Sequence, residues 1–201
     1  VGKDRAVESI RTALAMGADE GIRIDDTALE GTDGLGTARV IAAALKQIPC
    51  TLVIAGMRAV DDDGYLVPAA VAEFLDLPQI SMVVKQEIRD GKIRCERMVE
   101  GGTDVVEAKL PALFTTQRGI NEPRYASLPG IMKAKKKPLQ TKTLADIGIA
   151  PADVGRDNAK CVVQALSFPP ERAAGKIIQG ETAEAKAAEL VRLLREEAKV
   201  L

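Results

Sequence analysis

A short apolar run at residues 51–55, closed by Gly56, constrains the fold of this chain more than any other part of its sequence. Apolar residues recur at helical spacing over residues 7–14 and again over residues 35–48, which predicts two amphipathic helices. Residues 21–24 have the composition of a short strand between them. The order helix–strand–helix–strand is typical of a parallel sheet covered by helices. We therefore expect residues 51–55 to form a strand that is buried on both faces.

Capping residues indicate where the two helices begin. Asp4 is expected to cap the first helix and Asp33 the second, because aspartate oxygens accept hydrogen bonds from the free N–H groups of a first helical turn. Gly17 suits the end of the first helix. A parallel sheet of this kind should have more than two strands, so a further strand is expected before Asp4, with Val1 and Gly2 at its end. The sequence is accordingly interpreted as an N-terminally incomplete, doubly wound α/β domain.

The pattern changes to strand-like segments after a helix that is expected near residues 67–75. These segments occupy residues 80–88, 92–99 and 104–110. Asp90-Gly91 is a favourable two-residue turn between the first two, so the three segments predict a small antiparallel meander. A further apolar run, residues 111–116, is expected to return to the main sheet. Residues 1–118 are therefore interpreted as one α/β domain.

Residues 119–201 do not have the pattern of a compact domain. A long, mostly irregular stretch runs from Gly119 to Asn158, and such a stretch is uncommon inside a compact fold. A strand-like piece is expected at residues 161–166, and a final amphipathic helix at residues 181–199. We interpret the whole region as an extended C-terminal arm that wraps another subunit.

Composition excludes several classes of function. The chain has no histidine, and aromatic residues make up 2% of it. Histidine-based triads, histidine-ligated zinc and stacking platforms for nucleic-acid bases are therefore not expected. The net charge of −1 provides no electrostatic footprint for nucleic acid. Three widely spaced cysteines fit neither a disulfide framework nor a metal site and indicate a reducing compartment, and no apolar run approaches the length of a membrane span.

The loop at residues 56–67 is the first candidate site. Ligands of open α/β sheets bind beyond the carboxyl ends of the strands, and the N–H groups at a helix start can bind phosphate. The loop has this position but lacks the spacing of a phosphate-binding motif, and Asp61, Asp62 and Asp63 would repel an anion. An acidic loop that caps a helix is the alternative. A metal site is disfavoured, because adjacent aspartates of an extended chain cannot all face one ion.

The second candidate site is a docking segment that contains Leu128, Ile131 and Met132. These apolar residues lie between prolines and glycines, next to a basic run at residues 133–137. Exposed apolar anchors beside charge are typical of a docking loop, whereas a solvated stretch is the alternative for the basic run. No serine or cysteine has a base to activate it, so any reaction would need a bound cofactor.

Three segments of the chain resemble the electron transfer flavoprotein family, and in particular its beta subunits. They are residues 8–19 (ESIRTALAMGAD), 56–63 (GMRAVDDD) and 121–137 (NEPRYASLPGIMKAKKK). The resemblance implies a Rossmann-like, adenine-nucleotide-binding α/β fold with helices on both faces of the sheet and an arm around an alpha subunit. It implies that FAD is held mainly by the alpha subunit. The heterodimer would carry electrons from acyl-CoA-type dehydrogenases to a quinone oxidoreductase or another acceptor, so this subunit would be a carrier and not an enzyme.

The resemblance also assigns residues to sites. AMP, or a second FAD in bifurcating relatives, would be bound by Val1, Gly56, Met57, Arg58, Ala59, Val60, Asp61, Asp62, Asp63, Gly64, Tyr65, Leu66 and Val67. Dehydrogenases would be recognised, with Leu128 as the anchor, by Tyr125, Ala126, Ser127, Leu128, Pro129, Gly130, Ile131, Met132, Lys133, Ala134 and Lys135. Where the family commonly has Thr-Gly, this chain has Val67-Pro68, which removes a hydroxyl group and an N–H group that could bind the phosphate of AMP.

Two other functions stay open at the level of sequence. One is a stand-alone adenine-nucleotide-binding module that resembles universal stress proteins, and the other is a structural subunit whose nucleotide site has decayed. The bacterial cytoplasm is the favoured location, with the mitochondrial matrix as the alternative. Neither membrane insertion nor binding to nucleic acid is expected.

Overall fold

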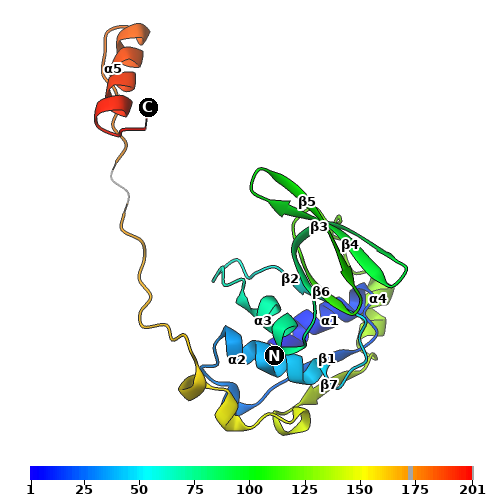
Figure 1. Cartoon of the computed structure of the whole chain (residues 1–201). Coiled ribbons are helices and arrows are strands. Elements are labelled where there is room, and N and C mark those ends of the chain that lie inside the picture. Colours follow the sequence, from blue (N-terminus) through cyan, green and yellow to red (C-terminus); the bar gives the residue numbers. More distant parts are fainter. Residues whose placement is uncertain (172–173, 201) are drawn as a thin grey trace. The chain divides into compact units, whose positions relative to one another are not determined.

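The computed structural model describes residues 1–171 and 174–200, which form two compact units, Val1–Val162 and Val163–Leu201. Residues 172, 173 and 201 of the expected arm lie outside the described residues. The helices are α1 (Ala6–Met16), α2 (Gly34–Leu45), α3 (Leu66–Phe74), α4 (Leu128–Ala134) and α5 (Ala183–Glu196) (Figure 1). The strands are β1 (Gly21–Ile24), β2 (Leu52–Gly56), β3 (Gln79–Arg89), β4 (Lys92–Val99), β5 (Gly102–Lys109), β6 (Ala112–Thr116) and β7 (Leu139–Lys142). Within the described residues, no helix has both the length and the apolar character needed to cross a membrane.

The first unit contains a five-stranded sheet in the order β2-β6-β3-β4-β5 and a two-stranded parallel sheet of β1 and β7. β6 lies between β2 and β3 and is parallel to both, so the expected return of residues 111–116 to the main sheet is confirmed. β3, β4 and β5 form the predicted antiparallel meander. Asp90 and Gly91 both have positive φ, 51° and 72°, as a tight two-residue hairpin turn requires.

The prediction that β2 is buried on both faces is wrong. β2 is an edge strand of the five-stranded sheet, with β6 as its hydrogen-bonded neighbour, and Ile54 is 61% exposed. A continuous apolar run fits a strand in the middle of a sheet, but the run alone does not determine how many neighbours the strand acquires.

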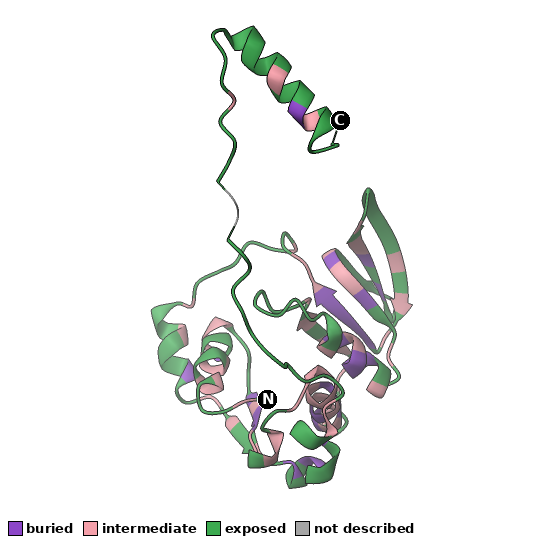
Figure 2. Ribbon diagram, turned by 90° about the vertical axis from the view of Figure 1, so that its left-hand side faces the viewer, coloured by how far each residue is buried: buried purple, intermediate pink, exposed green. Residues whose placement is uncertain are grey.

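α2 packs against both sheets. Its Val40 packs with Ile24 of β1, whereas Ala38 packs with Leu113 of β6 and with α3. Figure 2 shows how buried and exposed residues are distributed along the helices and strands. The helix begins where the sequence predicts, because the Asp33 Oδ1 accepts a hydrogen bond of 2.8 Å from the Gly36 N–H. This bond lowers the pKa of the Asp33 carboxyl group. α2 therefore contributes side chains to two separate core clusters, one beside each sheet.

The predicted cap of α1 is wrong, although the helix itself is confirmed. Arg5 occupies the capping position without a side-chain hydrogen bond to the helix. The Asp4 carboxylate instead accepts a hydrogen bond of 2.7 Å from the guanidinium group of the buried Arg23 in β1. A nearby cation competes with the helix N–H groups for the same carboxylate, and that competition is set by the fold. Gly17 ends the helix, as predicted, with a φ of 131°.

Residues 119–158 do not form the irregular arm that the sequence suggests. β7 pairs in parallel with β1, with Leu139 opposite Gly21. Leu144, which is 1% exposed, Ile147 and Val154 enter the same core cluster as Ile24 and Val40. The boundary between the two units thus lies after Val162 and not near residue 118. Short 3-10 turns allow the chain to bury its apolar residues without the helical or strand periodicity that a sequence pattern would reveal.

In the second unit, the described residues 163–171 and 174–182 form neither helix nor strand, and α5 follows them. The predicted helix is confirmed, and the Thr182 Oγ1 caps it by accepting a hydrogen bond of 3.2 Å from the Ala185 N–H. Leu193 is its buried residue. The strand-like piece expected at residues 161–166 is not a strand, and these residues are exposed. β-forming composition alone does not make a strand where no neighbouring strand offers hydrogen bonds.

Candidate functional site

Ligands of open α/β sheets bind beyond the carboxyl ends of the strands, and the carboxyl ends of β2 and β6 lie side by side at one such edge. The two strands are parallel neighbours, and Gly56 lies opposite Thr116 at their ends. A cavity of about 1420 Å³ opens there. The loop after β2 contributes Gly56, Met57, Arg58 and Val60 to its walls, and the segment after β6 contributes residues 116–124.

Side chains of the loop after β2 bind to one another. Arg58 forms an ion pair with Asp63, and its guanidinium group lies 5.4 Å from the centre of the Tyr65 ring. The Asp62 Oδ1 accepts a hydrogen bond of 3.0 Å from the Gly64 N–H. Two of the three consecutive aspartates are therefore engaged inside the loop and do not converge on a common ligand.

The start of α3 does not fit a phosphate group. The helix begins at Leu66, and Tyr65 before it makes no capping hydrogen bond with its side chain. Pro68 is the third residue of the helix and has no N–H to donate, while Val67 has no hydroxyl group. The aspartates of the same loop add negative charge. The residues present therefore do not fit an adenine nucleotide whose phosphate rests on α3.

The structure does not bring all of the expected nucleotide-site residues together. Val1 lines a different cavity of about 220 Å³, beside the carboxyl end of β1, together with Asp25 and Glu30. Ala59 and residues 61–67 do not line the large cavity. Four of the expected residues, Gly56, Met57, Arg58 and Val60, do line it.

Sequence reasoning missed the wall of the large cavity that follows β6. Thr116, Gln117 and Arg118 lie there, and the Gln117 Nε2 contacts the Met57 Sδ at 3.6 Å across the edge of the sheet. A signal was present, because residues 111–116 were expected to rejoin the main sheet. The carboxyl ends of parallel strands meet at one edge, so the residues after such a strand belong to the candidate site.

The docking segment forms α4, a short helix with its expected anchor on the surface. The Ser127 Oγ accepts a hydrogen bond of 3.2 Å from the Gly130 N–H and so caps the helix. Pro129 lies in the first turn, where its missing N–H costs no hydrogen bond. Leu128 is 79% exposed and Tyr125 is 98% exposed. The apolar residues that the sequence selected for docking are therefore available to another protein.

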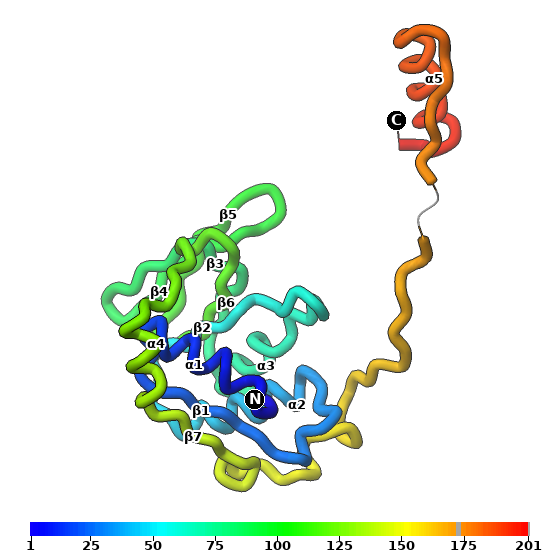
Figure 3. The backbone as a smooth tube through the Cα atoms, turned by 180° about the vertical axis from the view of Figure 1, so that it is seen from behind, coloured from blue at the N-terminus to red at the C-terminus, as the bar shows by residue number. Residues whose placement is uncertain are grey.

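α4 packs closely against α1, as the backbone trace shows (Figure 3). The guanidinium group of Arg124, just before the docking segment, donates a hydrogen bond of 2.6 Å to the Met16 carbonyl oxygen at the end of α1. A mostly apolar cavity of about 620 Å³ lies between the two elements and is lined in part by Ala15, Tyr125 and Ile131. The docking segment is thus supported by the α/β unit.

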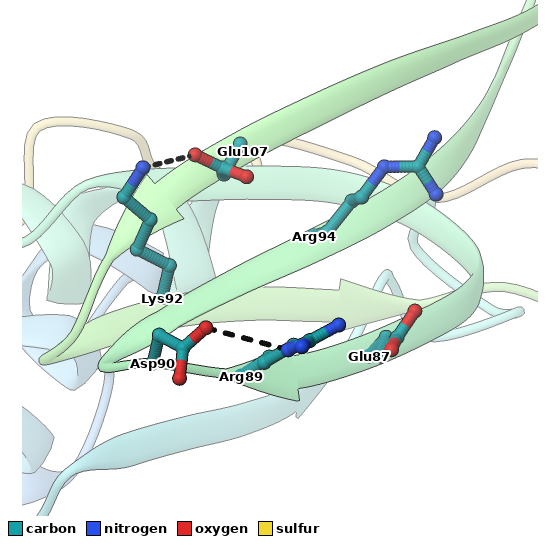
Figure 4. A pocket seen from close by; sticks show the side chains of 6 residues that line it. All are labelled: Glu87, Arg89, Asp90, Lys92, Arg94 and Glu107. Carbon is teal, nitrogen blue, oxygen red and sulfur yellow. Dashed lines mark hydrogen bonds and ion pairs between the residues drawn. The ribbon is translucent and has the colours of Figure 1, made fainter.

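The outer face of the meander carries a charged depression of about 290 Å³ (Figure 4). Lys92 of β4 pairs with Glu107 of β5 at 2.6 Å, and Arg89 pairs with Asp90 at 3.3 Å. Arg89 and Asp90 are largely exposed, and Lys92 and Glu107 are about half exposed. Ion pairs so open to water contribute little free energy to folding. Charges of both signs alternate across the strands, which is typical of a solvated sheet face.

Comparison with known proteins decides the family. The family model described as Electron transfer flavoprotein domain matches residues 1–147. The chain belongs to the electron transfer flavoprotein family. Its curated relatives include electron transfer flavoprotein subunit beta of Bacillus subtilis, which is 42% identical over 100% of this chain and 77% of the relative. The subunit beta of Mycobacterium tuberculosis is 43% identical over 90% of this chain and 68% of the relative.

A further relative is named as a subunit of a larger complex. The caffeyl-CoA reductase-Etf complex subunit CarD of Acetobacterium woodii is 36% identical over 98% of this chain and 75% of the relative. The resemblance drawn from residues 8–19, 56–63 and 121–137 is thereby confirmed. The chain has the role of an electron transfer flavoprotein beta subunit, a carrier component of a complex that involves flavin. Its mixed α/β architecture with a partly parallel sheet agrees with the Rossmann-like fold expected for this family.

Proposed function

We propose that this chain pairs with an alpha-type subunit and presents α4 to acyl-CoA-type dehydrogenases, with Leu128 as the apolar anchor. The heterodimer then delivers electrons to a quinone oxidoreductase or another acceptor. FAD, held mainly by the alpha subunit, supplies the redox chemistry of the complex. The observation that carries the proposal is that Leu128 is largely exposed on a short helix that packs against α1.

The charge around Leu128 supports a docking role. Lys133 and Lys135 follow it on and just after α4, and both are exposed. Exposed cations at the rim of an apolar anchor orient an approaching partner, whereas the anchor supplies the favourable burial. The neighbouring cavity between α1 and Ile131 adds apolar surface next to the same anchor.

The second unit supports pairing with another chain. Phe168 is 97% exposed and Leu166 is 93% exposed, and on α5 the side chains of Leu190 and Val191 are about half exposed. So many apolar side chains left open to water are typical of a segment that contacts another protein. We propose that residues 163–201 contact the alpha subunit, in keeping with the arm expected from the sequence.

The nucleotide loop has a smaller part in the proposed function. We propose that Gly56, Met57, Arg58 and Val60 form one wall of a cofactor-bearing cavity of the complex, and that the start of α3 does not hold the phosphate of AMP. The missing donors at Val67 and Pro68 support the latter point. This combination also favours, as a second candidate, a structural subunit with a decayed nucleotide site.

Kinetics with a docking partner test the proposal. The heterodimer is prepared with native chain and with Leu128→Ala, and flavin reduction is followed with an acyl-CoA dehydrogenase and its acyl-CoA substrate. We expect a KM for the heterodimer about tenfold higher in Leu128→Ala, as expected when a central apolar anchor is truncated, with unchanged flavin content. An unchanged KM would remove Leu128 from docking. A chain that elutes as a monomer in the presence of a co-expressed alpha subunit would favour the stand-alone nucleotide-binding module.

A further inference from the structure

Arg11 of α1 reaches the carboxyl end of α4. Its Nη1 donates hydrogen bonds to the carbonyl oxygens of Ala134, at 2.5 Å, and Lys137, at 2.9 Å. The last carbonyl groups of a helix have no partner within the helix, and they carry the negative end of its dipole. A guanidinium group at this position therefore satisfies two backbone acceptors and stabilises the end of the docking helix.

Lys137 makes the reciprocal connection. Its Nζ donates hydrogen bonds to the carbonyl oxygens of Leu14, at 3.0 Å, and Ala18, at 2.5 Å, at the carboxyl end of α1. Arg11 of α1 thus places a cation on the carboxyl end of α4, and Lys137, in the turn after α4, places one on the carboxyl end of α1. These four bonds are charge-assisted, which makes each of them stronger than a hydrogen bond between neutral groups.

The other lysines of the basic run differ from Lys137. Lys133, Lys135 and Lys136 are exposed, and within the described part of the chain their side chains make no hydrogen bond or ion pair. The basic run therefore contains two kinds of lysine. Lys137 donates hydrogen bonds to backbone carbonyl groups at the end of α1, whereas the other three lysines face solvent.

α4 needs such support because it is short. It has 7 residues, and isolated helices of this length are unstable in water. A docking segment that frays must be ordered again when the partner binds, and the free energy of that ordering weakens the affinity. A segment that is already held in the bound conformation avoids this loss.

We propose that Arg11 and Lys137 are positioning residues, which hold α4 in the conformation that docks to the dehydrogenase without contacting it themselves. The inference rests on the proposed docking role of the segment at residues 125–135. It assigns to α1 a function beyond packing, as the template on which the docking helix is held.

The test uses the flavin-loaded heterodimer with Arg11→Met and Lys137→Met, which keep the apolar stem and remove the donors. Arg5→Met, on an exposed residue before α1, is the matched control. The probe is a medium-chain acyl-CoA dehydrogenase reduced by octanoyl-CoA. We expect each variant to raise the KM for the heterodimer about tenfold, as the loss of charge-assisted hydrogen bonds predicts, without a change in kcat or flavin content. Hydrogen exchange at residues 125–137 should become faster, whereas Arg5→Met should change neither quantity.

Conservative variants separate positioning from a general loss of structure. Lys137→Arg and Arg11→Lys keep a donor at the end of a long side chain, so they should restore most of the affinity even if the methionine variants fold poorly. A native KM in all variants of Arg11 and Lys137, together with a raised KM in Leu128→Ala, would overturn the positioning role and leave docking intact. A raised KM in Arg11→Met with a native KM in Leu128→Ala would support positioning and remove Leu128 as the anchor. Native values throughout would overturn both.

Discussion

Gly130 of α4 lies against the backbone of Ala15 in α1, so closely that a Cβ atom on Gly130 would be 2.5 Å from the Ala15 carbonyl oxygen. The obstacle is backbone and not the end of a flexible side chain. The contact explains why a glycine stands in the first turn of the docking helix, where its weak helix propensity is a disadvantage.

Gly130→Ala should push α4 away from α1. We expect a loss of about 1–3 kcal/mol in the free energy of unfolding, the usual cost of overpacking, together with weaker docking to the dehydrogenase. Urea denaturation measures the first effect and flavin-reduction kinetics the second. Gly102→Ala is the control, because a Cβ at that position meets no atom within 4 Å. Equal stabilities for the two variants would contradict the close approach.

Asp33 should stabilise the first unit through both of its oxygens. Oδ1 accepts from the Gly36 N–H, and Oδ2 accepts from the Lys160 N–H at 2.7 Å and the Cys161 N–H at 3.2 Å. Asp33→Ala is therefore expected to lower the free energy of unfolding by about 1–2 kcal/mol. Asp33→Asn should cost less, because it retains the oxygen for the helix cap and loses one acceptor.

The contribution of Asp33 should also depend on pH. Hydrogen bonds from Gly36 lower the pKa of the folded carboxyl group below its unfolded value of about 3.9. The stabilisation is then fully present above that unfolded pKa and is lost as the pH falls through the lower, folded pKa. Denaturation at pH 7 and at pH 3 or below checks the sign. A difference between native chain and Asp33→Ala that grows on acidification would contradict the assignment.

The loss of donors at the start of α3 should be reversible by mutation. The double variant Val67→Thr with Pro68→Gly returns a hydroxyl group and an N–H to the helix start, and we expect it to bind AMP about tenfold more tightly than the native heterodimer. Titration calorimetry with AMP measures the change, and Val67→Ala with Pro68→Gly isolates the part due to the hydroxyl group. Release of stoichiometric AMP from the native heterodimer on acid extraction would show that the phosphate is held by other groups.

Leu144 should be a core residue despite its place in an irregular segment. It is almost fully buried with Ile24 and Val40, so Leu144→Ala is expected to cost about 2–5 kcal/mol in the free energy of unfolding. Leu166→Ala is the matched control, since Leu166 is exposed, and its effect should stay within about 0.5 kcal/mol. Thermal and urea denaturation compare the two. Similar, small effects would mean that residues 143–158 do not belong to the folded unit.

The sequence by itself determined those elements that depend on residues close together in the chain. The Asp33 cap, the Asp90-Gly91 turn and the strands of the meander depend on neighbouring residues, and each was found where the sequence predicts it. The family was also determined by sequence, because the segments at residues 8–19, 56–63 and 121–137 carry it. The exposed position of Leu128 followed from apolar residues confined between proline and glycine.

Tertiary structure alone decided the relationships between distant residues. Asp4 binds Arg23 instead of capping its helix, and Leu144 packs in the core although its segment is irregular. Arg11 binds the end of α4, more than a hundred positions further along the chain. Gln117 lines the large cavity, and β2 lies at the edge of its sheet. Both facts likewise depend on which strands become neighbours. Periodicity and propensity describe what a segment prefers by itself, whereas these contacts arise when a polar group or an apolar side chain finds its partner in the folded chain.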